Sequence, residues 1–337
     1  MLRTLQKRVS PLQHLGDEDM QSALLAVARD GPAADPAHLA LLLRKSREDA
    51  VDSRLRALCH REAAELIRER AAHLGPTAAA LRNTASLAGI DVPLSMLWFR
   101  TLPLVQLLLS WPHESPCCLV GLAGAPGAGK TTLCKILSSV AQQVTGQNVL
   151  TVSLDDFYLP PDVRQQRGHR WRAVPGTHDV DLLNRFVAEI KSSGGPISVP
   201  SYDSGAEVRR PPQVLPGPPR LCLFEGWFVG SALDDYDTLR RSLDTLIFLD
   251  IDLSDAREAR LDREAKVRQL GAKRGMPQSA VERFWDEALL PGTSSWVLPL
   301  RNSADLVLEL DREHRIQNIR IPNETTHLHG ADPLVGM

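Results

Sequence analysis

From Cys117 onward, short apolar runs alternate with stretches in which apolar residues recur at helical intervals. The apolar runs predict strands at Cys118–Ala123, Asn148–Leu154, Leu221–Glu225 and Thr245–Ile251. The helical intervals predict helices at Lys130–Thr145, Asp179–Ser192 and Ser254–Leu270. This alternation predicts an α/β fold with a parallel sheet covered by helices on both faces. The interval Tyr202–Arg220 holds five prolines and is expected to be a loop.

The first third of the chain has a different pattern. Between Ala33 and His73, Leu and Ala recur at helical intervals among Arg and Glu, which predicts helices. Gly75 and Pro76 are expected to end that run, because glycine caps helices and proline cannot continue them. The charges between Arg44 and Arg70 alternate in sign, which is typical of a solvated helix face. We therefore expect an all-helical N-terminal extension at residues 1–112, an α/β domain at 113–311 and a polar, irregular tail at 312–337.

Charge and hydropathy bear on the partners of the protein. The 337 residues include 39 Lys and Arg against 41 Asp and Glu, a net charge of −2, and a general nucleic-acid binder would normally show a basic excess. The most membrane-like stretch, Leu94–Trp111, is interrupted by Arg100, Pro103 and Gln106, whereas a spanning helix needs about 20 mostly apolar residues. We therefore expect neither a nucleic-acid nor a membrane partner, and a buried or amphipathic helix at this stretch.

The cysteines and the N-terminus bear on the compartment. The five cysteines form no C-x-x-C pair, which argues against a disulfide framework or a zinc ribbon and favours a reducing compartment. A cytoplasmic protein is the expectation. Arg3, Lys7 and Arg8, with no acidic residue before Asp17, leave a short organellar presequence as the alternative. The sequence does not fix the oligomeric state.

A glycine-rich loop between a predicted strand and a predicted helix is the strongest chemical signal. Residues 124–131 fit G-x-x-x-x-G-K-[ST] in full. Small residues let successive backbone N–H groups turn toward a polyphosphate, Lys130 can reach the β- and γ-phosphates, and the Thr131 hydroxyl can bind Mg²⁺. The following helix points its positive N-terminus at the anion. The pattern predicts an Mg·ATP site formed by Gly124, Ala125, Pro126, Gly127, Ala128, Gly129, Lys130, Thr131 and Thr132.

Two carboxylates follow the second predicted strand. Asp155 and Asp156 stand at the C-terminal end of that strand, where open α/β sheets bind ligands. An enzyme that phosphorylates a hydroxyl needs a carboxylate to accept or orient its proton. An aspartate pair that caps a turn is the alternative interpretation. The chain has no N-K-x-D, D-x-x-G or L-S-G-G-Q motif, which disfavours a regulatory GTPase and a transporter ATPase.

The segment Asp155-Asp-Phe-Tyr158 resembles the D-x-F-[YH] motif of the phosphoribulokinase, uridine kinase and pantothenate kinase group of P-loop kinases. Further segments resemble one branch, D-glycerate 3-kinase: Pro175–Asp179, Val199–Asp203, Phe224–Trp227 with Gly230, and Arg268–Met276 leading to Phe284 and Pro291. Where that branch reads Y-D-K-S-A, this chain has Ser204 in place of the lysine. The resemblance covers residues 116–310 and implies a P-loop NTPase fold, with ATP and Mg²⁺ as cofactors. It also implies Asp155 as the catalytic base and Glu225, which ends a strand, near the Mg²⁺.

Basic residues supply candidates for binding the acceptor and the transferred phosphoryl group. Arg164, Arg167, Arg170 and Arg172 crowd a stretch that has no acid between Asp162 and Asp179. Because arginine binds carboxylates and phosphates bidentately, this stretch favours an anionic acceptor, with a solvated basic loop as the alternative. In the kinase group, a helical lid at Ser254–Leu270 carries basic side chains to the phosphoryl group. The basic residues along this predicted helix are Arg257, Arg260, Arg263, Lys266 and Arg268. Arg263 is the candidate among them, with a charged helix face as the alternative interpretation. The predicted acceptor-binding residues are Tyr158, Arg172, His178, Asp179, Tyr202 and Arg209.

Together these features predict an ATP-dependent kinase that phosphorylates a hydroxyl of a small, anionic metabolite, with D-glycerate as the first choice. A uridine, pantothenate or sugar kinase of the same group is one alternative, and an ATP-binding P-loop protein without turnover is another. The predicted catalytic residues are Asp155, Lys130 and Arg263, and the predicted metal ligands are Thr131 and Glu225.

Overall fold

The structure is a computed structural model that describes residues 18–111, 113, 115–192, 194–269 and 277–322. The chain divides into two compact units, Met1–Trp111 with Arg315–Ile319, and Pro112–His314 with Arg320–Met337. The presequence candidates Arg3, Lys7 and Arg8 lie outside the described residues, as do Gly275 and Met276 of the family-like segment. Within the described ranges, each helix is too short or too polar to cross a bilayer.

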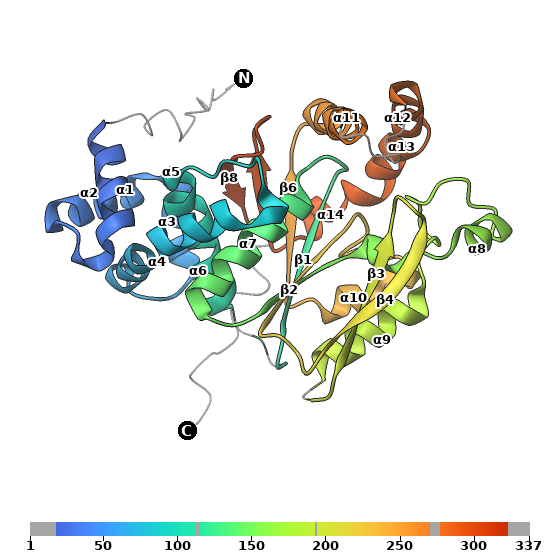
Figure 1. The fold of residues 1–337 in the computed structure, drawn as a ribbon, viewed down its shortest axis with the longest axis horizontal. Coiled ribbons are helices and arrows are strands. Elements are labelled where there is room, and N and C mark those ends of the chain that lie inside the picture. The colour runs from blue at the N-terminus through green and yellow to red at the C-terminus, as the bar shows by residue number, and fades with distance from the viewer. Residues whose placement is uncertain (1–17, 112, 114, 193, 270–276, 323–337) are drawn as a thin grey trace, which may run out of the picture. The chain divides into compact units, whose positions relative to one another are not determined.

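Helices form the first unit (Figure 1). They are α1 (Glu18–Asp30), α2 (Pro36–Glu48), α3 (Ala50–Leu58), α4 (Ala63–Asn83), α5 (Leu94–Met96) and α6 (Leu102–Ser110). A π-helical turn, Leu97–Thr101, joins α5 to α6, and 3-10 turns lie at Gly31–Ala33 and Ala85–Leu87. The predicted helical stretch from Leu94 is confirmed, and most of its residues between Leu97 and Leu108 are buried.

The predicted helix end at Pro76 is wrong, because α4 continues through it. Gly75 lies against α1, where a Cβ would come within 1.9 Å of the Ala28 carbonyl oxygen. This glycine therefore allows two helices to approach closely and does not act as a cap.

The expectation of a solvated charged face is wrong at Arg70, whose side chain is buried. Its guanidinium donates to the Asp52 carboxylate at 2.8 Å and to the Gln106 side-chain oxygen at 2.8 Å. Burial raises the pKa of Asp52 and lowers the pKa of Arg70, although each partner opposes the shift of the other. The pair belongs to the interior of the helical unit.

A parallel sheet organises the second unit. Its strands β1 (Cys118–Gly124), β2 (Val149–Ser153), β5 (Leu221–Glu225), β6 (Thr245–Asp250) and β7 (Leu306–Leu310) lie in the order β2-β5-β1-β6-β7. Helix α7 (Lys130–Thr145) packs against β1, β2 and β5, while α9 (Val180–Lys191) and α10 (Asp234–Ser242) share a buried cluster with Phe224 and Phe248 of the sheet. The predicted α/β fold, a parallel sheet flanked by helices, is confirmed.

Shorter elements complete this unit. A 3-10 turn, Leu154–Phe157, follows β2, and α8 (Pro161–Gln166) comes next. Helix α11 (Leu253–Gln269) precedes α12 (Gln278–Phe284), the π-helical turns Trp285–Leu289 and Thr293–Val297 around α13 (Leu290–Gly292), and α14 (Leu300–Ser303). Residues Ile316–Arg320, expected to be irregular, form the strand β8, with Ile316 and Ile319 buried, and all of β8 except Arg320 belongs to the first unit.

The predicted loop at Tyr202–Arg220 is also wrong, because β4 (Val208–Leu215) pairs antiparallel with β3 (Ile197–Asp203). The register shifts where Pro200 of β3 faces Pro211 and Pro212 of β4. Proline has no N–H to donate and is therefore tolerated at a bulge and on an exposed strand, and β4 is exposed along nearly its whole length. The proline count indicated an interruption of the main sheet but not the hairpin itself.

Candidate active site

The strand register brings the predicted chemistry to one edge of the sheet. Gly124 ends β1, Ser153 ends β2 and Glu225 ends β5. Glu225 is paired with Ser153 on one side and with Leu122 on the other. Because these strands are parallel, the loop after β1, the turn after β2 and the carboxylate that ends β5 lie at the same carboxyl edge, where α/β sheets bind ligands.

Lys130 forms hydrogen bonds to the backbone of the glycine-rich loop that precedes it. Its side chain is buried, and its ammonium donates to the carbonyl oxygens of Gly124 at 2.8 Å and of Ala125 at 3.0 Å. Burial lowers the pKa of Lys130, whereas the charges of Glu225 and Asp155 act in the opposite direction. The charges of Glu225 and Asp155 therefore favour the ammonium form of Lys130, which is the form that can contact phosphates.

The loop is closely packed on its outer side. Gly127 has φ +86°, and a Cβ there would come within 2.0 Å of the Ala256 carbonyl oxygen in the first turns of α11. The ring of His314 adds a second support, with Nε2 at 2.7 Å from the Gly127 carbonyl oxygen. His314 could not be identified from the sequence, because a single histidine after the last predicted helix carries no recognisable pattern.

Thr131 and Glu225 are joined by a hydrogen bond. The Thr131 hydroxyl donates to a carboxylate oxygen of Glu225 at 2.8 Å, and Glu225 is buried. Burial raises the pKa of Glu225, while Lys130 acts to lower it. A hydroxyl and a carboxylate at this distance are oxygen ligands of the kind that Mg²⁺ prefers, so these two residues fit the predicted metal.

The two aspartates after β2 differ in their surroundings. Asp156 accepts hydrogen bonds from the backbone N–H groups of Ser153 at 3.3 Å and Tyr202 at 3.1 Å, and burial raises its pKa to about 6. Asp155 is exposed, and its charge acts on Lys130 and on Glu225. Asp156 therefore fixes the turn to β3, and Asp155 is the carboxylate that a substrate can reach.

Helix α11 presents different arginines on different faces. Arg260 is mostly buried, with a side chain 19% exposed that pairs with Glu264 at 2.9 Å, and its Nε has no hydrogen-bond partner among the described residues. Burial lowers the pKa of Arg260, and Asp155 is among the charges that oppose this shift. The predicted Arg263 is exposed. Its role stays a prediction, and Arg260 is an arginine of α11 on which the charge of Asp155 acts.

The predicted acceptor residues gather around the ring of Tyr158. The His178 ring stacks on it with centroids 4.5 Å apart, and the Tyr202 ring meets it edge-on at 5.7 Å. The guanidinium groups of Arg164 and Arg172 lie over the same ring, at 5.7 Å and 6.0 Å from its centroid. Tyr158 follows Asp155 by three residues, so this aromatic and cationic cluster adjoins the exposed carboxylate.

Three buried polar atoms of this cluster have no hydrogen-bond partner among the described residues. They are Nη1 of Arg164, Nε2 of His178 and the hydroxyl of Tyr202. Burial lowers the pKa of His178 to about 3, so the ring is neutral, and its Nδ1 lies 2.8 Å from the Tyr236 hydroxyl. Buried polar groups normally find partners, so three unpaired ones together are typical of a site that binds a polar ligand.

The other predicted acceptor residues form ion pairs at the edge of this cluster. Arg209 donates to Asp179 at 3.0 Å and to the Tyr158 carbonyl oxygen at 3.2 Å. Asp179 also caps α9, since its carboxylate accepts from the Leu182 N–H at 3.0 Å. Arg172 donates to the Ser204 carbonyl oxygen at 2.7 Å. The structure thus brings all six predicted acceptor residues together, and it adds Arg164, which the sequence analysis considered only as part of a basic stretch.

A family model described as the Phosphoribulokinase / Uridine kinase family matches residues 119–317. The chain belongs to this family. A pantothenate kinase from Nocardioides sp. is 28% identical over 234 residues, 62% of this chain and 70% of that protein. A uridine kinase from Staphylococcus epidermidis is 26% identical over 192 residues, 56% of this chain and 86% of that protein. This chain is an ATP-dependent small-molecule kinase, as predicted.

Among solved structures, a D-glycerate 3-kinase from Cryptococcus neoformans var. grubii has a similar fold. It superposes with a TM-score of 0.55 at 21% sequence identity, over 64% of this chain and 96% of that one. At this identity the likeness supports the P-loop kinase fold and leaves the acceptor open.

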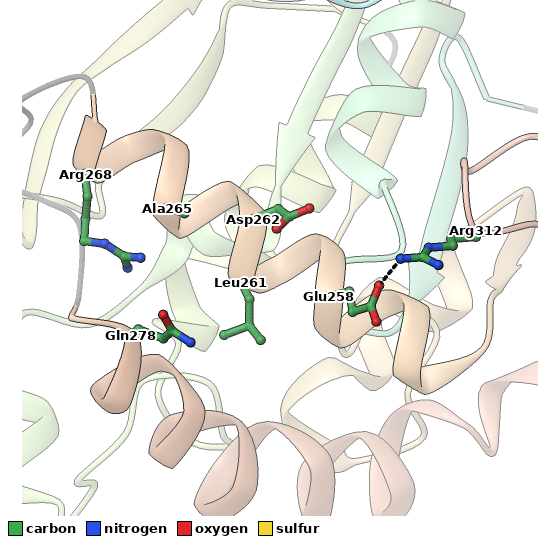
Figure 2. Close-up of a pocket in the computed structure, with 7 residues that line it drawn as sticks. All are labelled: Glu258, Leu261, Asp262, Ala265, Arg268, Gln278 and Arg312. Atoms are coloured by element: carbon green, nitrogen blue, oxygen red, sulfur yellow. Dashed lines mark hydrogen bonds and ion pairs between the residues drawn. The ribbon is translucent and has the colours of Figure 1, made fainter.

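A hollow of about 340 Å³ lies on another face of α11 in this kinase, between Glu258, Leu261, Ala265 and Arg268 of the helix and Gln278 (Figure 2). An ion pair between Glu258 and Arg312, at 2.5 Å, lies at one end. Because an α-helix turns about 100° per residue, Arg260 points roughly opposite to Glu258. The hollow is therefore separate from the face of α11 that carries Arg260.

Proposed function

We propose that this kinase transfers the γ-phosphoryl group of Mg·ATP to a hydroxyl of a small carboxylate, with D-glycerate as the acceptor. Arg164 carries the proposal. Its side chain is only 7% exposed, it lies over the Tyr158 ring beside Asp155, and its Nη1 has no hydrogen-bond partner among the described residues. An unpaired donor on a buried guanidinium favours an anionic ligand, because charge-assisted hydrogen bonds to a carboxylate compensate its desolvation.

Asp155 has the geometry for the proton step. It is exposed at the carboxyl edge of the sheet, between the glycine-rich loop and Tyr158, so it can accept the hydroxyl proton while orienting the oxygen toward the γ-phosphate. The charge of Asp155 acts on both Arg260 and Lys130, and these two side chains supply the positive charge that stabilises negative charge on the phosphoryl group during transfer. Thr131 and Glu225 would hold Mg²⁺, which neutralises phosphate charge when bound.

The carboxylate of the acceptor separates the candidates. D-glycerate carries a carboxylate beside its hydroxyls and is the substrate named for the structural neighbour from Cryptococcus neoformans var. grubii. Pantothenate, named for the relative from Nocardioides sp., also carries a carboxylate and is the second candidate. Uridine lacks an anionic group and would leave Nη1 of Arg164 without an anionic partner.

Steady-state kinetics of Arg164→Gln test the proposal. A hydrogen bond to a charged group contributes about 1.5–3 kcal/mol, so the KM for D-glycerate is expected to rise about tenfold to a hundredfold. The KM for ATP should not change, which also reports that the variant is folded. Arg167→Gln is the matched control, because Arg167 lies in the same stretch but is exposed. A KM for D-glycerate that is the same in the wild type and in Arg164→Gln would contradict the carboxylate assignment.

A further inference from the structure

The geometry points to Glu207 as an internal carboxylate that competes with the acceptor for Arg164 and Arg172. We propose that an anionic acceptor displaces Glu207 from these two arginines, and that Glu207 thereby weakens the preference of the pocket for anionic over neutral acceptors. The inference rests on the proposed function in taking the acceptor to be a carboxylate.

Glu207 contacts both arginines of the Tyr158 cluster through one oxygen. Its Oε1 lies 3.0 Å from Nη2 of Arg164 and 3.4 Å from Nη1 of Arg172. Both guanidinium groups lie over the Tyr158 ring, which is beside the candidate base. A carboxylate of a bound acceptor that reached these guanidinium groups would meet the same donors that Glu207 uses.

The two sides of this contact differ in burial. The Arg164 side chain is 7% exposed, whereas the Glu207 side chain is 44% exposed. Glu207 can therefore leave toward solvent without opening the core, while Arg164 stays in place with one donor, Nη1, already unpaired. A displaced Glu207 regains hydration, so the exchange of one carboxylate for another costs little.

The turn that precedes Glu207 fixes the position of its backbone. Glu207 has φ +55°, a left-handed conformation that residues other than glycine rarely adopt. The preceding turn is fixed by Asp203, whose carboxylate accepts from the N–H groups of Gly205 at 2.9 Å and Ala206 at 3.0 Å and pairs with Arg210. The hairpin between β3 and β4 therefore fixes the backbone of Glu207 beside the two arginines, while its side chain can still turn toward solvent.

In this arrangement, the charge of the acceptor determines whether Glu207 is displaced from the two arginines. A neutral acceptor cannot replace Glu207, and both arginines stay neutralised by it. An acceptor with a carboxylate restores the ion pairs that Glu207 gives up, and the hydroxyl of the same molecule is then beside Asp155. Four arginines in one stretch indicate an anionic ligand from sequence alone, but Glu207 offsets part of that charge.

Removing only the charge of Glu207 tests the inference. A partly exposed ion pair contributes up to about 1 kcal/mol, so Glu207→Gln is expected to lower the KM for D-glycerate about fivefold. The KM for ATP should stay the same, and so should the dissociation constant of glycerol, the neutral analogue. Glu287→Gln is the matched control, because Glu287 pairs with Arg170 at 3.2 Å outside the Tyr158 cluster. This variant should leave both KM values and the dissociation constant of glycerol unchanged.

Direct binding separates this inference from the proposed function. Calorimetric titration with D-glycerate and with D-lactate measures carboxylate affinity whether or not phosphate is transferred. Tighter binding of both to Glu207→Gln, without turnover of D-glycerate by the wild type, would support the inference and refute the glycerate assignment. Unchanged or weaker carboxylate binding in Glu207→Gln, or an equal gain for glycerol, would overturn the inference.

Discussion

Replacing Gly127 with alanine tests whether the glycine-rich loop is held in a shape that only glycine permits. A Cβ at this position would lie 2.0 Å from the Ala256 carbonyl oxygen, where real contacts are essentially never under 3.0 Å. The loop and α11 must therefore separate by at least about 1 Å, and a misplacement of about 1 Å at a reacting site can cost about a hundredfold in rate. The backbone adds strain, because a left-handed conformation costs a residue other than glycine about 1–2 kcal/mol.

Gly146→Ala separates these two effects. Gly146 also has positive φ, +67°, but a Cβ there meets nothing within 4 Å. Both variants are expected to lose about 1–2 kcal/mol in the free energy of unfolding, measured by denaturant titration. Only Gly127→Ala is expected to lose Mg·ATP affinity, measured by calorimetry, and to fall about a hundredfold in kcat/KM for ATP. A Gly127→Ala protein with ATP affinity within about twofold of the wild type would refute the steric reasoning, since about twofold is well below the loss expected from a 1 Å shift.

Three further predictions follow from individual contacts. Arg260→Gln should lower kcat at least tenfold, because loss of a charge-assisted contact to the phosphoryl group costs about 1.5–3 kcal/mol. Arg263→Gln should change kcat less than about twofold. Steady-state kinetics that show the reverse order would support Arg263 as the phosphoryl contact. Burial raises the pKa of Asp156 from 3.8 to about 6, so the protonated form is favoured on folding and the free energy of unfolding should fall by up to about 3 kcal/mol as pH rises through this window. Denaturant titrations of Asp156→Asn from pH 4 to pH 7 should lack that decrease, and an unchanged decrease would assign it to other groups. His314→Ala removes a hydrogen bond to the Gly127 carbonyl and should raise the KM for ATP about threefold to tenfold, with kcat nearly unchanged. An unaltered KM for ATP would show that His314 does not support the loop.

Strand periodicity and the phosphate-loop pattern were sufficient to predict four strands of the main sheet, but not β7, and the edge at which the site lies. The apolar runs predicted β1, β2, β5 and β6, each within one residue of its bounds. Because the order of residues in the loop 124–132 determines its chemistry, the nucleotide site could be predicted without the sheet order. The helical extension could be predicted as helical, but the continuation of α4 through Pro76 depends on close packing of α1 at Gly75, which is a tertiary contact.

The parts of the site that the sequence analysis missed depend on long-range contacts. Arg164 and Glu207 lie 43 residues apart, and the hairpin that carries Glu207 was predicted to be a loop because of its prolines. The choice between Arg260 and Arg263 depends on which face of α11 is buried, and α11 is so rich in charge that no apolar stripe reveals that face. His314 contacts a loop 187 residues before it. None of these contacts leaves a periodic signal in the sequence.

The role of Asp155 is the central claim, and a coupled ADP-release assay on Asp155→Asn beside the wild type tests it most directly. D-glycerate, L-glycerate, pantothenate, uridine, ribulose 5-phosphate and simple sugars serve as acceptors, and Mg·ATP affinity is measured in parallel. We expect turnover of D-glycerate by the wild type, and a loss of about a hundredfold to ten-thousandfold in kcat for Asp155→Asn, the contribution typical of a general base, with ATP still bound. Asp155→Asn with wild-type turnover, or a wild type that binds ATP and phosphorylates none of these acceptors, would contradict the account.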